Sequence, residues 1–458
     1  MWSEHRILRT LRVRYAQLPH VLPALLSVIG EEGGDYGEIT IVRVDARRVV
    51  RDVTVFSDSV EHFRRIVARI EALDDVEILE VRDEVLEMHQ GGKIAVRSRY
   101  TVDSVRALRR VYTPGVAEVC RLIADEPDLA WRYTAITHLV AIVTDGTAVL
   151  GLGDIGPVAG MPVMEGKAAL MESLVGLSGM PVLLQTKDPR RIIETVEAIA
   201  PTFAAIQLED ISAPRCFEIE EALAERLDRP VMHDDQHGTA VVVLSVLLTA
   251  MRRLGRDLGS VRIGQIGLGA AGMAIARLAM KVSGSAVLGA DLDRDAVARL
   301  ERYGGTGSTI PEIMANCDVV VATTGAPGLI APGMIREGQI VLALSNPVPE
   351  IEPDAALEAG AAFAADGKTV NNVLGFPGIL RGVVDARAPR ITDEMYLAAA
   401  HAIADRTPQD KLVPDPLDKE LHRAVARAVA RTALDQGLAR ADLTGYFSET
   451  AETSSCAP

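Results

Sequence analysis

Residues 261–280 read VRIGQIGLGAAGMAIARLAM, and this stretch decides the fold of the chain. An apolar strand pattern leads into Gly267, Gly269 and Gly272, a helical pattern follows at once, and the next strand pattern ends at Asp291. Glycines at these places let the backbone approach a pyrophosphate, the helix N-terminus attracts its charge, and the acid accepts from a ribose hydroxyl. The stretch therefore predicts a Rossmann-like, dinucleotide-binding domain.

The acid at the end of the second strand also predicts which dinucleotide is bound. Asp291 would disfavour a ribose 2′-phosphate, which favours NAD, although Arg294 close by keeps NADP as the alternative. Seven residues of this domain are expected to contact the cofactor, namely Gly267, Leu268, Gly269, Ala270, Ala271, Gly272 and Asp291.

The same glycine spacing occurs once more, earlier in the chain. Gly151, Gly153 and Gly156 satisfy it, but Pro157 follows directly and the pattern there predicts no clean helix. A glycine pattern that does not open a helix is a weak signal for a nucleotide. This earlier loop is therefore not expected to be the cofactor site.

Composition narrows the class of partner and the compartment. The formal net charge of −15 argues against nucleic acid or an anionic membrane as the main partner. The four cysteines lie far apart without CxxC spacing, which is typical of a reducing compartment. The apolar stretch at 18–30 lacks a cleavage site, and the run at 240–251 is too short to span a bilayer. We expect a cytoplasmic protein.

Outward from the glycine loop, the hydrophobic pattern predicts an α/β chain of several domains. Residues 7–85 follow the order β-α-β-β-α-β of a small ferredoxin-like α+β domain. Strands and helices then alternate as in parallel sheets covered by helices. The predicted divisions are a ferredoxin-like domain at 1–88, a parallel-sheet substrate and metal domain at 89–240, a Rossmann-like domain at 241–390, C-terminal helices at 391–446 and a disordered tail at 447–458.

Two pairs of acids follow two consecutive strand patterns. Glu209 and Asp210 directly follow FAAIQL, and Asp234 and Asp235 are the last two residues of PVMHDD. Parallel strands deliver such residues to one edge of the sheet, where four carboxylates would need a cation, and oxygen ligands favour Mg²⁺ or Mn²⁺. Either pair alone would be a helix cap or a solvated loop, whereas both together favour a metal. His233 lacks a cysteine or second histidine at zinc spacing and is expected only to form a hydrogen bond.

Two further side chains are candidates for acid–base chemistry. Lys167 in MEGKAALM is expected in the first turn of a helix, where a cation is unfavourable, and a nearby metal would loosen its proton and make it a general base. The alternative is a solvent-facing lysine. Tyr112 precedes a Thr-Pro-Gly turn and, judged alone, is more often a half-buried packing residue than an acid.

Taken together, these motifs resemble those of malic enzymes, in particular the shorter bacterial branch of that family. The match runs in order across residues 110–385, and the combination is far more specific than any single piece. The stretches that carry it are YTPGVAEVC, VTDGTAVLGLGDIGPVAGMPVMEGKAALM, LEDISAPRCFEIE, HDDQHGTA, GLGAAG, LSNPVPEI and NNVLGFPGILRG.

The resemblance implies oxidative decarboxylation of L-malate to pyruvate with NAD and a divalent metal. It implies that Glu209, Asp210 and Asp235 hold Mn²⁺ or Mg²⁺. Lys167 would take the proton from the C2 hydroxyl of malate as hydride leaves for the nicotinamide. Tyr112 would protonate the enolate that remains after CO₂ departs.

The resemblance also assigns supporting residues. Asp234 would assist the catalytic lysine or the metal, Asn346 and Asn371 would contact the nucleotide, and Asn372 would contact the substrate carboxylate. One departure is plain, because larger family members have a substrate-binding arginine where this chain has Ala148. The residue that clamps that carboxylate is therefore unassigned.

The first 85 residues resemble an ACT domain, a regulatory unit that often binds an amino acid between paired copies. The usual glycine after proline is His20 here, and the usual asparagine after the glycines is Asp35. Either change could remove the ligand pocket, so a pairing module without an effector is an equal alternative. The resemblance implies a homodimer or a higher homo-oligomer.

Two other functions compete with the first. Malolactic chemistry would use the same site but retain NADH and release lactate. A catalytically silent amino-acid sensor would need no active site. The presence of all five chemistry-bearing residues argues against the sensor, namely Tyr112, Lys167, Glu209, Asp210 and Asp235.

Overall fold

The structure is a computed structural model that describes residues 7–149 and 151–447. It divides into two compact units, Met1–Ala95 and Val96–Pro458, which we call the N-terminal unit and the main unit and describe separately. Most of the predicted tail at 447–458 lies outside the described residues.

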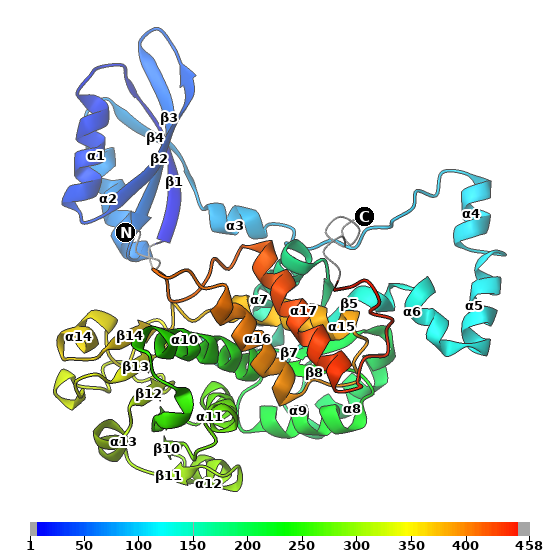
Figure 1. The fold of residues 1–458 in the computed structure, drawn as a ribbon. Coiled ribbons are helices and arrows are strands. Elements are labelled where there is room, and N and C mark those ends of the chain that lie inside the picture. Colours follow the sequence, from blue (N-terminus) through cyan, green and yellow to red (C-terminus); the bar gives the residue numbers. More distant parts are fainter. Residues whose placement is uncertain (1–6, 150, 448–458) are drawn as a thin grey trace. The chain divides into compact units, whose positions relative to one another are not determined.

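The N-terminal unit has the predicted ferredoxin-like order. Its antiparallel sheet has the strand order β2-β3-β1-β4, and two helices pack beside it (Figure 1). Alternate residues of the first strand, Leu11, Val13 and Tyr15, are buried against Leu25 and Ile66 of the two helices, so the unit has a core of its own. The elements are β1 (Ile7–Ala16), α1 (Val21–Glu31), β2 (Asp35–Val44), β3 (Arg48–Ser57), α2 (Val60–Glu71) and β4 (Val76–Arg82).

The end of this unit differs from the prediction. The predicted order closes with a strand, but β4 stops at Arg82 and a short helix, α3 (Glu84–His89), follows. The helix begins there because the Asp83 carboxylate accepts from the backbone N–H of Leu86 at 3.1 Å and caps it.

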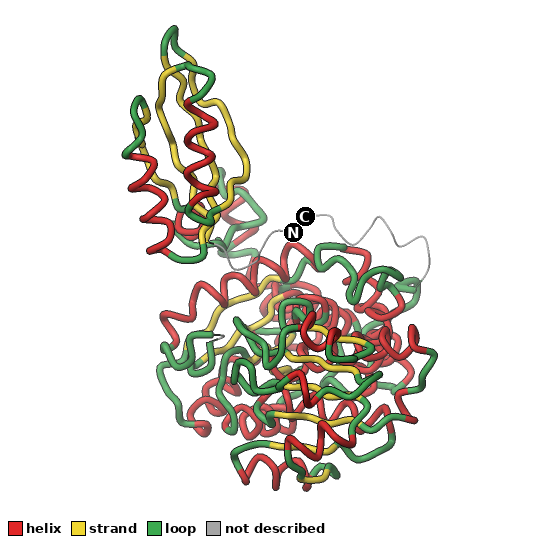
Figure 2. Tube along the Cα trace, turned by 90° about the vertical axis from the view of Figure 1, so that its left-hand side faces the viewer, coloured by secondary structure: helices red, strands yellow, loops and turns green. Residues whose placement is uncertain are grey.

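The first sheet of the main unit is fully parallel, with the strand order β6-β5-β7-β8. Its strands are short and apolar, and helices connect them. Figure 2 shows the strands of the main unit lying among its helices. The strands are β5 (Leu139–Thr144), β6 (Ser178–Leu183), β7 (Ala205–Leu208) and β8 (Val231–His233), and the helices are α7 (Pro157–Val175), α8 (Pro189–Ile199) and α9 (Arg215–Arg226).

The second sheet is also parallel and has the order β11-β10-β9-β12-β13-β14, which is the strand order of a dinucleotide-binding Rossmann fold. The order reverses between β9 and β12, where such folds bind ligands. The strands are β9 (Ile263–Ile266), β10 (Leu288–Ala290), β11 (Thr306–Gly307), β12 (Val319–Ala322), β13 (Ile340–Ala343) and β14 (Phe363–Asp366), and the helices are α11 (Ala270–Ser283), α12 (Arg294–Arg302), α13 (Ile310–Asn316) and α14 (Pro353–Glu358).

A buried helical segment joins the two sheets. The π-helical turn η4 (Asp234–Gly238) continues into α10 (Thr239–Leu254), which packs against α11 and α16. Among the described residues, Asp234–Leu254 is long and apolar enough to cross a membrane, yet 67% of its apolar window is buried inside the protein. It is the central core helix of the main unit.

The remaining elements are the C-terminal helices, the helices near the start of the main unit and several 3₁₀ turns. The helices α15 (Phe376–Asp385), α16 (Asp393–Asp405) and α17 (Lys419–Asp435) pack on one another; α16 and α17 lie within the predicted helical stretch at 391–446, whereas α15 precedes it. Near the start, α4 (Val105–Val111) and α5 (Val116–Asp125) precede the short α6 (Ala130–Tyr133). The 3₁₀ turns are η1 (Pro127–Leu129), η2 (Ala135–His138), η3 (Ala200–Thr202), η5 (Leu258–Ser260), η6 (Pro332–Met334) and η7 (Asn372–Leu374).

Candidate active site

The two acid pairs meet as the strand pattern predicts. β7 and β8 are parallel neighbours, so Glu209 and Asp210 leave the same sheet edge as Asp234 and Asp235. One carboxylate oxygen from each of Glu209, Asp210 and Asp235 lies within 4.8 Å of the other two. We call these four acids the carboxylate cluster.

Unusual backbone conformations bring the carboxylates of the cluster together. Asp210 adopts a left-handed backbone with φ of 54°, and its N–H donates to the Asp235 carboxylate at 3.0 Å. Asp234 and Asp235 open the π-helical turn η4, a rare conformation that occurs mostly at functional sites. A side chain at Gly238 would meet Asp234 Oδ1 at 1.9 Å, so only glycine leaves room for that carboxylate.

Burial makes the carboxylate cluster electrostatically costly. The Asp234 side chain is 0% exposed, and burial raises the pKa of Asp234 to about 8. Burial, reinforced by the neighbouring acids, raises the pKa of Asp210 to about 8 as well. Within the described part of the chain, Asp210 Oδ2 and Asp234 Oδ1 are buried and have no hydrogen-bond partner. A set of buried, crowded carboxylates with free oxygens fits a hard divalent cation such as Mn²⁺ or Mg²⁺.

Lys167 joins the cluster from α7, but in a different setting from the one predicted. The helix begins at Pro157, directly after the first glycine loop, so a clean helix does start there and Lys167 lies well beyond its first turn. Its side chain is only 11% exposed, so it does not face solvent. The ammonium donates to Asp234 and lies 3.0 Å from Glu209 Oε1 and 4.6 Å from the centre of the Phe376 ring.

The charge state of Lys167 follows from these neighbours. Burial disfavours its ammonium form, but the carboxylates of Asp234 and Glu209 outweigh burial and raise the pKa of Lys167 above its usual range. The prediction that the positive end of the helix would disfavour the Lys167 ammonium is therefore wrong. The carboxylates of Asp234 and Glu209 determine the pKa of Lys167 instead. Lys167 can lose its proton only when something else compensates those carboxylates.

Asn372, predicted to contact the substrate, lies at the cluster. Its amide donates to Asp234 Oδ2 at 2.8 Å from the turn η7. The turn η4 contacts both η7 and the Rossmann helix α11, so the cluster adjoins the nucleotide-binding half of the main unit. A substrate bound there would lie between the two sheets.

The second glycine loop has the close packing that a dinucleotide site requires. Gly267 has φ of 87°, and a Cβ on it would lie 2.7 Å from the carbonyl oxygen of Thr323 after β12. A Cβ on Gly272 would lie 1.9 Å from the Gly267 carbonyl oxygen. The loop opens α11, which starts at Ala270 directly after Gly269. This cradle at the strand-order reversal fits a pyrophosphate.

The other predicted cofactor contacts are Asp291, Asn346 and Asn371, and Asp291 lies at the glycine loop. Asp291 directly follows β10, and its carboxylate accepts from the N–H groups of Leu268 at 2.6 Å and Asp293 at 2.8 Å, which ties it to the glycine loop. Asn346 is half-buried and follows β13. Asn371 is exposed and caps η7, because its side-chain oxygen accepts from Val373 N at 3.0 Å.

Tyr112 is the one predicted catalytic residue that the chain does not bring to the cluster. It follows α4, its side chain is 66% exposed, and Figure 1 shows α4 and α5 standing out from the rest of the main unit. Within the described structure, α4 and α5 contain no buried residue. Its proposed role stays a prediction.

Sequence reasoning missed two polar residues that surround the cluster. Gln207 donates to Glu209 Oε2 at 2.5 Å, and Glu220 on α9 is buried and bonds to the start of η4. Gln207 could have been found from its place in an apolar strand two residues before Glu209, where a polar side chain needs a partner. Glu220 could not have been found in the same way, because it stands among other glutamates in FEIEEALAER and nothing in the sequence marks it as the buried one.

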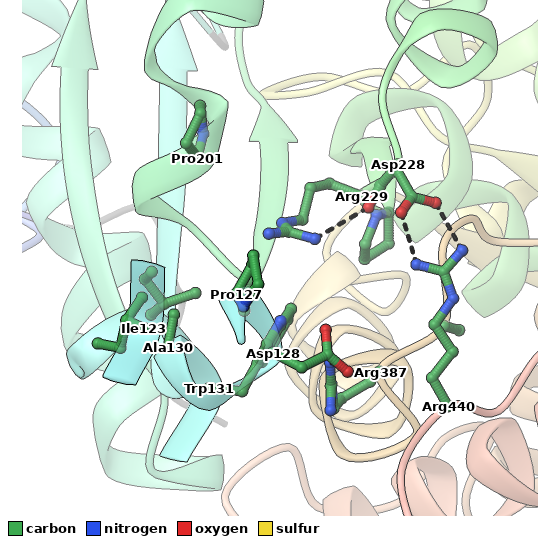
Figure 3. A pocket seen from close by; sticks show the side chains of 14 residues that line it. Ile123, Pro127, Asp128, Ala130, Trp131, Pro201, Asp228, Arg229, Arg387 and Arg440 are labelled. Carbon is green, nitrogen blue, oxygen red and sulfur yellow. Dashed lines mark hydrogen bonds and ion pairs between the residues drawn. The ribbon is translucent and has the colours of Figure 1, made fainter. Parts of the chain in front are cut away.

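A separate cavity of about 350 Å³ contains no residue of the cluster (Figure 3). Three guanidinium groups line it, and each has a partner. Arg440 pairs with Asp228 at 2.6 and 2.7 Å, Arg387 pairs with Asp128 at 3.2 Å, and Arg229 lies 4.9 Å from the Trp131 ring centre. The Arg440–Asp228 pair ties the segment after α17 to the α9–β8 loop, and the Arg387–Asp128 pair ties the segment after α15 to η1.

Comparisons with known proteins point to one family. The family model described as "Malic enzyme, N-terminal domain" matches residues 92–224, which include Lys167, Glu209 and Asp210. The model described as "Malic enzyme, NAD binding domain" matches residues 307–434, which include Asn372.

Individual relatives agree with the family models. "NAD-dependent malic enzyme 1" of Bacillus subtilis is 54% identical over 436 residues, which are 95% of this chain and 99% of that protein. "Bifunctional malic/malolactic enzyme" of the same organism is 40% identical over 79% of this chain and 95% of its own length. The crystal structure of malic enzyme from Pyrococcus horikoshii superposes with a TM-score of 0.73 at 40% identity, covering 78% of this chain and 91% of that one.

Proposed function

Because this chain belongs to the malic enzyme family, we infer that it oxidises and decarboxylates L-malate to pyruvate and CO₂ with NAD and a divalent cation. The observation that carries this function is the buried carboxylate cluster with Lys167 at its centre, adjoining a Rossmann crevice. Three acids supply ligand atoms for the cation, namely Glu209, Asp210 and Asp235.

The geometry supports the following residue roles, which the family resemblance implies. Bound NAD would supply a hydride acceptor for C2 of malate, and a bound divalent cation would supply a Lewis acid for the substrate oxygens during loss of CO₂. Lys167 takes the proton from the C2 hydroxyl. Asp234 orients the lysine through a direct hydrogen bond, and Asn372, held by Asp234, presents its amide to the substrate. The Phe376 ring packs against the Lys167 ammonium and so limits access of water to it.

A rate assay with malate and Mn²⁺, comparing NAD with NADP, tests this function. Steady formation of NADH with pyruvate as product supports it, with NAD preferred because of Asp291. The similarity to a relative named as bifunctional malic/malolactic makes lactate the second product to measure. Lactate without free NADH would overturn the oxidative reaction in favour of the malolactic one.

Metal binding by the cofactor-free protein is expected to strengthen as pH rises. Burial and the neighbouring acids raise the pKa of the ligand Asp210 to about 8 without the metal, so below that pH the site holds a proton that a cation must displace. We expect Mn²⁺ affinity to rise by up to about tenfold per pH unit from about pH 6 to about pH 8 and then to level off. Calorimetry in two buffers of different ionisation enthalpy measures the protons released, and the absence of any release at about pH 6.5 would contradict the raised pKa of Asp210.

We propose that the protein is at least a homodimer and that Tyr112 acts in the site of a partner copy. The cluster lacks a tyrosine from its own α4, and Tyr112 is exposed beside other exposed apolar side chains of that segment, Val105, Leu108 and Val111. Such a segment gains stability when a second copy covers it. The same contact would bring a proton donor to C3 of the substrate.

Mixing two inactive variants is expected to restore activity. Tyr112→Phe lacks the acid and Lys167→Ala lacks the base, so each homodimer should be nearly inactive. In a mixed dimer that shares residues across the interface, one of the two sites is intact, which gives about a quarter of normal activity after statistical exchange. The measurement is NADH formation after co-expression of the two variants. No recovery, with mixed dimers verified by mass spectrometry, would place Tyr112 in its own chain's site.

We further propose that the N-terminal unit is an ACT-like regulatory module in a cytoplasmic enzyme. Its ferredoxin-like order and separate core support a distinct module. His20 and Asp35, the two departures, are both exposed, and Asp35 accepts from Tyr36 N at 2.8 Å. Adding single amino acids to the rate assay tests for an effector. No response to any of them would favour a pairing role alone.

A further inference from the structure

Glu220 is a buried carboxylate that the proposed reaction does not use. It lies on α9, is 8% exposed, and does not belong to the carboxylate cluster. Burying a carboxylate is costly unless hydrogen bonds or opposite charge compensate it. Its partners therefore indicate what it does.

Three hydrogen-bond partners of Glu220 belong to one short segment. Oε1 accepts from the backbone N–H of His233 at 2.7 Å, and Oε2 accepts from the Gln236 amide at 2.8 Å and pairs with His237 Nε2 at 3.1 Å. These residues stand on both sides of Asp234 and Asp235 in the sequence. One carboxylate on α9 thus holds the turn η4 before and after the two acids.

These partners favour the ionised form of Glu220. Burial alone would raise the pKa of Glu220, but the attraction and hydrogen bond from His237 outweigh it and lower that pKa. The ring of His237 also stacks on Tyr396 of α16, with centres 4.5 Å apart and planes within 3°. The turn η4 is therefore bonded to Glu220 of α9 and stacked on Tyr396 of α16.

The conformation of η4 explains why it needs such support. A π-helical turn is rare and persists only where its surroundings hold it. If the turn relaxed to an ordinary α-helix, the residues per turn would change, and Asp234 and Asp235 would point in other directions. Asp235 would then lose its place beside Glu209 and Asp210.

We propose that Glu220 is a positioning residue of the divalent-cation site, which it builds by holding η4 in the π-helical form. The inference rests on the proposed function, because it assumes that Asp235 binds the cation. It predicts that Glu220 sets cation affinity without touching the cation.

The main test is Glu220→Gln, which preserves shape but exchanges an acceptor for a donor. Mn²⁺ affinity is measured by electron paramagnetic resonance of free Mn²⁺ on the full-length protein, without malate or NAD. We expect about a 10- to 100-fold weaker affinity, as for other residues that orient metal ligands. Glu225→Gln, the same exchange at an exposed position of α9, should leave affinity unchanged.

A second variant separates positioning from loss of negative charge. His237→Phe keeps an aromatic ring against Tyr396 and keeps the charge of Glu220, but removes one bond to it. We expect a weaker but clear loss of Mn²⁺ affinity, of about threefold to tenfold. This variant also serves if Glu220→Gln does not fold.

Two outcomes would overturn the inference. If Glu220→Gln and His237→Phe lower the melting temperature but leave Mn²⁺ affinity unchanged while Asp235→Asn loses it, Glu220 only stabilises the fold. If the unaltered protein binds no Mn²⁺, the cation site itself is wrong, and the inference falls together with that part of the proposed function.

Discussion

Replacing Lys167 by alanine is expected to lower kcat by roughly a thousandfold, the usual contribution of a positioned general base. The variant loses the group that takes the C2 hydroxyl proton, and water is a poor substitute in a buried site. Mn²⁺ affinity should stay the same or increase, because Asp234 and Glu209 lose their cationic partner. The two measurements are kcat at saturating malate, NAD and Mn²⁺, and Mn²⁺ binding without substrate.

A surface lysine provides the control for this prediction. Lys281→Ala removes a half-exposed lysine that pairs with Glu394, and its turnover should stay within about twofold of normal. If Lys167→Ala keeps more than about a tenth of normal kcat, Lys167 is not the base. If its kcat falls only because Mn²⁺ no longer binds, the lysine is a structural member of the cluster.

Asp235→Asn is expected to weaken Mn²⁺ binding by roughly a hundredfold. The asparagine can still accept from Asp210 N, so the local backbone is preserved while one anionic ligand is lost. Activity at low Mn²⁺ should nearly vanish and should recover in part at high Mn²⁺. The measurement is turnover as a function of Mn²⁺, together with direct binding.

The contradicting result is equally clear. Near-normal turnover of Asp235→Asn at low Mn²⁺ would remove Asp235 from the ligand set. Glu225→Gln is the matched control here too, since it removes an exposed carboxylate from the same part of the main unit. Measured together, Asp235→Asn and Lys167→Ala separate metal binding from proton transfer.

Most of the fold could be predicted because it repeats a local pattern. Short apolar strands that alternate with helices indicate parallel sheets, and the glycine loop with Asp291 identified the Rossmann half. The helix at Pro157 was missed, because proline after glycine looks like an interruption although proline is favoured in the first turn of a helix. The short helix after Asp83 was missed because its cap is a local side-chain bond.

The sequence predicted which residues form the site, but not their burial or the direction of their pKa shifts. That two strand ends would meet followed from parallel topology, and the meeting of Glu209, Asp210 and Asp235 is confirmed. The burial of Lys167 and the sign of its pKa shift depend on side chains that converge in space. The same is true of Glu220, whose partners lie on another element and follow no sequence period.

Asn372 bonds to Asp234 across 138 positions of the chain. A ribosome needs roughly 7 to 28 seconds to synthesise that stretch. During this interval the nascent polypeptide contains Asp234 but not Asn372, whose amide bonds to it. Catalytic competence therefore emerges late in translation, and a product terminated before this asparagine would be unable to turn over substrate.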